Sequence, residues 1–166
     1  AIFDDRLGLA FDRVHHCAGP PIYDSLLSNA YVYPGQVCSH LLLGLMRRPW
    51  ADVRYDDVSL YSRLGFVVAH ESAHQILSAP YNPAVLATVA SEYSESERNE
   101  GVADVLGALA VIETGKVSPL QICEHQAQIW CAREPEGYVW PTTRSHPPPN
   151  ARGDKLCRSL RNLGVL

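Results

Sequence analysis

The stretch "VVAHESAHQ" contains two histidines, His70 and His74, with Glu71 directly after the first. On a helix, residues four positions apart project from one face about one turn apart, so both imidazoles can bind one metal ion. Glu71 can then take a proton from a water molecule at the metal. This H-E-x-x-H pattern therefore predicts a zinc site with hydrolytic chemistry. The alternative is a pair of surface histidines on an amphipathic helix.

A third ligand for such a site is available downstream, in "ERNEGVADVLGALAV". A hydrolytic zinc site needs three protein ligands and an open position for water. Glu100 can complete a His-His-Glu site, and Asp104, one turn later, can accept the free N–H of a ligand histidine. The alternative is a solvated first turn whose acids favour the helix dipole. That alternative fits Asp104 poorly, because valine, alanine and leucine surround it.

The elements that must position these side chains follow from hydrophobic spacing and from cap and turn residues. Apolar residues at helical spacing predict a helix over residues 59–77, ended by Pro80. Tyrosine and valine around a central Pro-Gly predict an edge strand or hairpin over residues 29–39. Further helices are expected over residues 95–114, from Ser118 to about residue 133, and over residues 155–162. The expected fold class is α+β, mostly helical with a small N-terminal strand region, in a single compact domain over residues 1–166.

Composition limits the classes of partner. Of the residues, 46% are hydrophobic and 19% charged, which is typical of a globular protein. The net charge of −4 gives no general attraction for nucleic acid or an anionic membrane, so neither partner is expected. No stretch approaches the roughly 18 apolar residues of a membrane span. The first residues lack the features of a signal peptide, so an exported protein would be represented here by its processed form or an excised domain.

The chain has five cysteines: Cys17, Cys38, Cys123, Cys131 and Cys157. None forms a C-x-x-C pair, so a cysteine-based zinc site is not expected. An odd number leaves at least one thiol free or bonded outside the chain. Cys123 and Cys131 lie eight residues apart on one expected helix, about 12 Å along its axis. That separation exceeds the reach of a disulfide, so the two are not expected to bond to each other.

Five segments, in one order between residues 29 and 163, resemble the catalytic half of the neprilysin and endothelin-converting-enzyme family of zinc endopeptidases. "VVAHESAH" resembles the family's V-x-x-H-E-x-x-H helix, and "NEGVADVLGAL" resembles its G-E-N-I-A-D motif with Glu100 and Asp104 in register. "HQAQIWCAREPEG" resembles F-A-Q-V-W-C with its following P-E, and "NAY" resembles the N-A-[FY] strand. "SHPPPNAR" places His146 six residues before Arg152, as in the family.

The resemblance implies a zincin-like metallopeptidase domain with one Zn²⁺ per chain. The implied zinc ligands are His70, His74 and Glu100, with water in the fourth position. Glu71 would be the general base on that water and would pass the proton to the leaving amine. By the same resemblance, His146 would donate a hydrogen bond to the oxyanion.

The resemblance also implies how a peptide or protein substrate would bind. Arg152 would bind the carbonyl just beyond the scissile bond, and Asn29 and Ala30 would align the substrate backbone as an added strand. An apolar pocket for the side chain after the cut is implied for Phe66, Val67 and Trp130. Cleavage on the amino side of apolar residues is therefore expected. Plain core packing is the alternative for Phe66 and Trp130.

Some features depart from the family. Arg144 stands two residues before His146, where the family usually has an aspartate. The large helical domain that covers the family's substrate chamber (the roof domain) is absent from this sequence, as is the family's C-terminal Cys-x-x-Trp. The cysteine at the Cys131 position normally bonds to the missing domain, so here it would be free or re-paired, with Cys157 as a candidate partner. The family implies an extracellular location, as a secreted protein or an ectodomain.

Two other functions are compatible with the same residues. One is a catalytically weak or inactive binding protein on a peptidase scaffold that retains zinc, and the other is a structural zinc domain without substrate. Glu71 argues against both, because a purely structural site does not need a base beside the metal.

Overall fold

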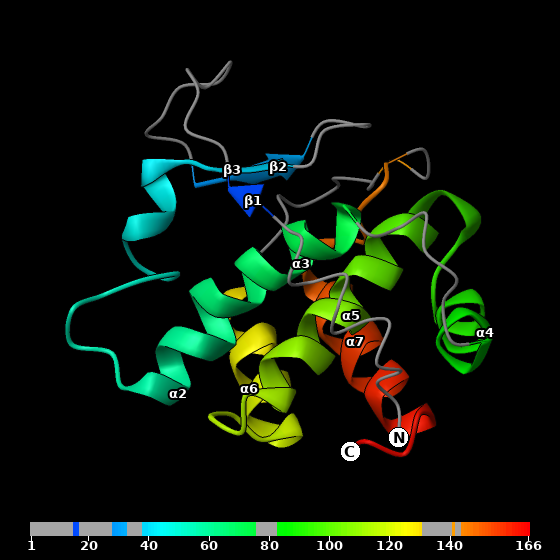
Figure 1. The fold of residues 1–166 in the computed structure, drawn as a ribbon. Helices are drawn as coiled ribbons and strands as arrows, with labels where there is room; N and C mark the ends of the chain where they lie inside the picture. Colours follow the sequence, from blue (N-terminus) through cyan, green and yellow to red (C-terminus); the bar gives the residue numbers. More distant parts are fainter. Residues whose placement is uncertain (1–14, 17–27, 33–37, 76–82, 131–140, 142–143) are drawn as a thin grey trace.

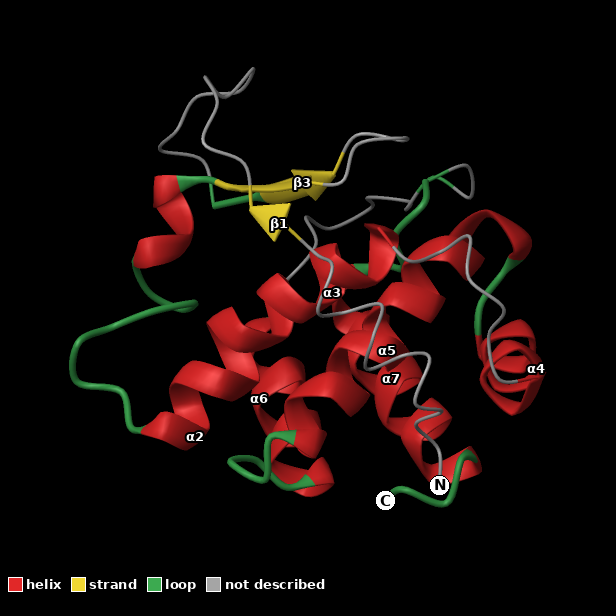
Figure 2. Ribbon diagram, viewed as in Figure 1, coloured by secondary structure: helices red, strands yellow, loops and turns green. Residues whose placement is uncertain are grey.

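The computed structural model describes residues 15–16, 28–32, 38–75, 83–130, 141 and 144–166. A small sheet lies at one side of a group of packed helices (Figures 1 and 2). The elements in chain order are β1 (His15–His16), β2 (Ala30–Val32), β3 (Cys38–Leu41), the 3-10 helix η1 (Leu43–Met46), α2 (Asp57–Leu60), the π-helix η2 (Tyr61–Gly65), α3 (Phe66–Gln75), α4 (Pro83–Glu92), the 3-10 helix η3 (Glu95–Glu97), α5 (Arg98–Glu113), α6 (Pro119–Ile129) and α7 (Pro149–Asn162). This composition agrees with the expected α+β class.

The described sheet has the strand order β1-β3-β2. β2 and β3 are antiparallel, with Ala30 opposite Leu41 and Val32 opposite Ser39, which agrees with the edge strand or hairpin expected over residues 29–39. The Pro-Gly turn itself lies outside the described residues. β1 pairs with β3 in parallel. Because β1 is only two residues long, the sequence pattern did not predict this pairing. Both hairpin strands contact α3, so the sheet packs against the helix of the H-E-x-x-H pattern.

The H-E-x-x-H pattern lies in α3, at the end of a helical run that begins at α2 and passes through the π-turn η2 (Figure 1). The Asp56 side chain caps the run by accepting a hydrogen bond from the Ser59 backbone N–H at 2.8 Å. The run agrees with the expected helix, although its π-turn was not foreseen. Pro80, the expected end of the helix, lies outside the described residues.

α5 is the central helix of the described structure. All of its residues from Gly101 to Leu109 are buried, so it is covered on every side. A capping box between Ser94 and Glu97 precedes it, and Gly115, at a φ of 69°, follows its C-terminal end. These boundaries confirm the helix expected over residues 95–114.

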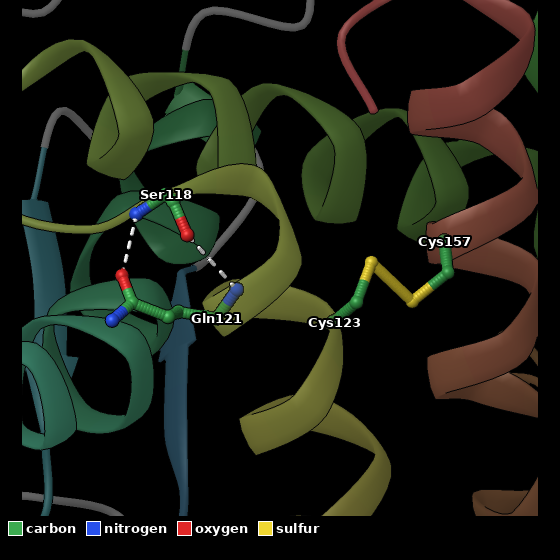
Figure 3. The surroundings of a disulfide bond; sticks show 4 residues. All are labelled: Ser118, Gln121, Cys123 and Cys157. Carbon is green, nitrogen blue, oxygen red and sulfur yellow. Dashed lines mark hydrogen bonds between the residues drawn. A yellow bond between two sulfur atoms is a disulfide. The ribbon is translucent and has the colours of Figure 1, made fainter.

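α6 begins where Ser118 and Pro119 predict. Ser118 and Gln121 form a capping box, in which the Gln121 N–H donates to Ser118 Oγ at 3.3 Å and the Ser118 N–H donates to Gln121 Oε1 at 2.9 Å (Figure 3). The helix ends at Ile129 with Trp130 as its C-cap residue, so the expectation of a helix to about residue 133 was too long.

α7 begins at Pro149, six residues before the start expected from the sequence. Pro149 is compatible with this earlier start, because proline is favoured in the first helical turn, where its missing N–H costs nothing. Gly153 therefore lies inside the helix. A Cβ at Gly153 would lie 3.1 Å from the backbone of Ala127 on α6, so a glycine permits the close packing of α6 and α7.

A disulfide joins Cys123 on α6 to Cys157 on α7, with their Cα atoms 5.5 Å apart (Figure 3). Because Cys157 is bonded to Cys123, the suggestion that it pairs with Cys131 was wrong. The bond also agrees with the expectation that Cys123 and Cys131 are not joined to each other. Cys131 itself lies outside the described residues.

α4 was not foreseen in the sequence. Its residues Val85 and Val89, one turn apart, are buried and belong to the main hydrophobic core. The helix contacts α5 and α7 and thereby covers part of the core (Figure 2). Within the described ranges, no helix combines the length and apolarity that crossing a membrane would require.

Candidate metal centre

α3 and α5 bring together the side chains that the sequence suggested as zinc ligands. His70 Nε2 lies 3.1 Å from His74 Nε2, and Glu100 Oε2 lies 3.2 Å from the first nitrogen and 3.4 Å from the second. These three atoms form a nearly equilateral triangle. Zinc at about 2.0–2.1 Å from each of four tetrahedral ligands separates the ligand atoms by about 3.3 Å. The triangle therefore has the size of one face of a tetrahedral zinc site.

The orientation of Glu100 supports the same assignment. Its Oε2 atom is buried, and no donor in the described part of the chain meets it with hydrogen-bond geometry, although three imidazole nitrogens lie within 3.4 Å. A buried carboxylate oxygen without a hydrogen bond is costly. Nitrogens that approach this oxygen without being directed at it fit a shared metal ion between them. The donor set of two imidazoles and a carboxylate also fits zinc.

Asp104 and Arg152 hold His70 from its other side. His70 Nδ1 lies 2.9 Å from Asp104 Oδ1, so the ring presents Nε2 toward the ligand triangle. Arg152 donates to both oxygens of the same carboxylate, through Nε at 2.9 Å and Nη2 at 2.6 Å. Both Asp104 and Arg152 are buried. The expected role of Asp104 as the orienting group thus has the geometry it requires.

These contacts shift the ionisation of the cluster. Burial opposes the charged form of His70, but the carboxylates of Asp104 and Glu100 outweigh it and raise the pKa to about 9. Burial likewise opposes ionisation of Asp104, yet Arg152 and His70 hold its pKa at about 2. For Glu100 the three histidines outweigh burial and lower the pKa. The cluster therefore keeps both carboxylates ionised, which is the form that binds a cation.

Glu71 differs from the other two acids. It is buried, and its side chain has no hydrogen bond or ion pair to any residue in the described ranges. Burial is the main influence on its carboxyl group and raises its pKa. A carboxylate with a raised pKa and no competing partner is suited to act as a general base.

His146 and Arg152, the two residues of the motif "SHPPPNAR", both lie at the centre, but they make different contacts. His146 Nε2 lies 3.0 Å from Glu100 Oε2, and its side chain is 45% exposed. Arg152 was expected to bind a substrate carbonyl, yet the side chain is buried and its Nε and Nη2 atoms both donate to Asp104. Its guanidinium also lies over the Trp130 ring, 4.4 Å from the ring centroid.

The residues suggested for the substrate pocket separate into two clusters. Phe66 is 1% exposed and belongs to the main core with α5. Val67 and Trp130 pack against a smaller cluster formed by Ala30, Leu45 and Trp50. The structure therefore places Val67 and Trp130 beside the sheet, whereas Phe66 lies in the core. Asn29, just before β2, is exposed.

Gln126 connects this region to the π-turn, although it was not among the site residues that the sequence suggested. Its side chain is fully buried, donates to the Ser62 backbone oxygen at 2.6 Å and accepts from Trp130 Nε1 at 2.9 Å. Gln126 thus fixes the ring on which Arg152 stacks. One signal was available: a glutamine one turn after the buried Ile122 and Cys123 is a polar residue on the apolar face of its helix.

Comparisons of the chain with protein-family models, with curated proteins and with solved structures give no match. The assignment of the centre therefore depends on its own geometry and chemistry.

Proposed function

We propose that the protein is a zinc-dependent endopeptidase. The observation that carries the proposal is the triangle of His70 Nε2, His74 Nε2 and Glu100 Oε2, with sides of 3.1–3.4 Å. Next to it is the Glu71 carboxylate, which has no hydrogen bond or ion pair to another described residue. The first three residues are the proposed ligands of one Zn²⁺, and Asp104 orients His70. Such a centre hydrolyses a peptide bond by adding water across it.

When bound, zinc supplies a Lewis acid that polarises the peptide carbonyl and lowers the pKa of water. Glu71 accepts a proton as the water oxygen bonds to the carbonyl carbon. It then delivers that proton to the amide nitrogen as the carbon–nitrogen bond breaks. The products are a carboxylate and an amine. His146 donates a hydrogen bond to the developing oxyanion.

The sheet and the smaller apolar cluster suggest how a peptide substrate would be bound. β2 is an outer strand of the described sheet, and its start at Asn29 and Ala30 suits alignment of an extended peptide as an added strand. Val67 and Trp130, beside this strand, are the proposed contacts for an apolar side chain after the cut. Arg152, through the part of its guanidinium not bonded to Asp104, is the proposed contact for the next carbonyl. The disulfide is compatible with a proposed extracellular location.

The test compares the wild type with Glu71→Gln on one apolar peptide and one unfolded protein, with zinc content measured in each sample. Glutamine keeps the shape of the side chain but cannot accept the proton, so zinc binding and fold should persist. General-base catalysis contributes about 10²–10⁴-fold, and the turnover rate should fall by that factor.

A control variant is Glu113→Gln, which makes the same chemical change at an exposed position on α5. Its turnover should equal that of the wild type. Equal rates for the wild type and Glu71→Gln would refute the assigned base. A zinc-loaded wild type that binds the peptide without cleaving it would be a binding protein on a peptidase scaffold.

A further inference from the structure

His146 lies closer to the proposed zinc ligands than an outer hydrogen-bond donor needs to be. Its Nε2 atom is 3.0 Å from Glu100 Oε2, a separation similar to those within the ligand triangle. The ligand atoms of His70, Glu100 and His146 all lie within 4.8 Å of one another. His74 Nε2 is not part of that group, but it lies 3.1 Å from His70 Nε2 and 3.4 Å from Glu100 Oε2. One nitrogen of each of the three histidines thus lies within 3.4 Å of Glu100 Oε2.

The contact between His146 and Glu100 is not an ordinary hydrogen bond. Glu100 Oε2 has no partner with hydrogen-bond geometry in the described part of the chain, so the imidazole nitrogen approaches this oxygen without being directed at it. The other ring nitrogen, Nδ1, lies 3.2 Å from the Ser145 hydroxyl. If Nδ1–H donates to that hydroxyl, Nε2 presents its lone pair to the centre, as a zinc ligand must.

His146 also differs from the other donors in its exposure and in the element that carries it. His70 and His74 are anchored on α3 and Glu100 on α5, with side-chain exposures of 5%, 18% and 13%. His146 comes from the segment before α7, and nearly half of its side chain is exposed. It can therefore leave the centre without disturbing the packed helices.

We propose that His146 is the fourth protein ligand of the zinc ion when no peptide is bound, and that a substrate must displace it. This inference rests on the proposed zinc site and concerns its regulation. A zinc site with four protein ligands is closed, whereas a hydrolytic site needs an open position. The displaced imidazole remains next to the centre and, once its Nε2 atom has taken up a proton from solvent, can serve as the hydrogen-bond donor to the oxyanion.

X-ray absorption spectroscopy of the zinc-loaded full chain counts the imidazoles on the metal. We expect three in the wild type and two in His146→Ala. The visible spectrum of the Co²⁺-loaded protein should change in parallel. Zinc affinity, measured by chelator competition, should fall at least about 100-fold, beyond the range usual for outer contacts. His125→Ala, at a histidine on α6 outside the cluster, should leave all three readouts unchanged.

A count of two imidazoles in the wild type, unchanged in His146→Ala, overturns the inference. Circular dichroism verifies that both variants are folded, and His146→Asn provides a second substitution at the same position. Peptide turnover, measured in the same samples, separates this result from the proposed function. Three imidazoles without turnover would support the fourth ligand but refute the peptidase function, because the site would be closed and structural. Two imidazoles with turnover would refute the fourth ligand and support an open peptidase site. A wild type that binds no zinc would refute both.

Discussion

At the scale of single residues, Glu100 determines the charge of the centre. Three histidines, His70, His74 and His146, approach the same carboxylate oxygen, and they lower its pKa despite burial. The site therefore presents an ionised oxygen to a cation at neutral pH. A neutral amide in its place would bring an NH₂ group, which cannot bind the metal, and an oxygen that is a weak ligand.

Glu100→Gln should accordingly weaken zinc binding by more than about 100-fold, because loss of a ligand exceeds the 10–100-fold effect of losing an outer contact. Chelator competition, followed by metal analysis after dialysis, measures the effect. Glu113→Gln on the same helix should bind zinc like the wild type. If Glu100→Gln retained wild-type affinity, Glu100 would not be a ligand.

At the scale of elements, the approach of α3 and α5 sets the ligand geometry. A Cβ at Gly107 would lie 2.9 Å from the backbone nitrogen of His70 and 3.0 Å from its Cα atom. Gly107 lies one turn after Asp104 on α5. The absence of a side chain at Gly107 thus allows α5 to bring Asp104 and Glu100 within reach of His70.

Gly107→Ala should separate the two helices and lower both stability and zinc affinity. In an unconstrained helix, alanine would stabilise by about 1 kcal/mol relative to glycine. Here the new methyl group meets rigid backbone, and overpacking costs about 1–3 kcal/mol. We expect a lower free energy of unfolding in urea, measured without zinc.

Gly65→Ala is the matched control, because the nearest atoms to its Cβ would be 3.7 Å away, an ordinary contact. This variant should keep zinc affinity. If Gly107→Ala were as stable as Gly65→Ala and bound zinc equally well, the close approach would not be needed for the site.

At the scale of the whole molecule, α6 and α7 form a unit that positions Arg152 at the metal centre. The disulfide Cys123–Cys157 and the close contact at Gly153 hold the two helices together. α7 carries Arg152, and α6 leads into Trp130, on which the guanidinium stacks. The position of Arg152, and with it that of Asp104, therefore depends on this pair of helices.

Replacing both Cys123 and Cys157 by alanine should lower the free energy of unfolding by about 4 kcal/mol, from the chain entropy of a loop that spans a sequence separation of 34. Urea unfolding of the zinc-free protein measures the loss. Reduction of the wild type should produce the same shift, and a reductant should not shift the double variant further. Zinc should still bind the folded variant, because no proposed ligand is a cysteine. Equal stability of the double variant and the oxidised wild type would contradict this role.

The sequence by itself determined the features that depend on neighbours along the chain. The spacing of His70 and His74, the cap at Ser118 and the stop at Gly115 each involve residues within a few positions of one another, so local geometry suffices to predict them. The strand pairing around the Pro-Gly turn and the placement of Glu100 and Asp104 on one helix face had the same basis.

Only the tertiary structure decided which distant residues meet. Cys157 pairs with Cys123 because α7 lies against α6, and Gln126 becomes a buried link because its side chain reaches the Ser62 carbonyl oxygen of the π-turn. The start of α7 at Pro149 and the direct approach of His146 to Glu100 were likewise not predictable from spacing. In each case the stabilising contact joins residues far apart in the chain. Whether that contact forms depends on how the helices pack, which no local pattern specifies.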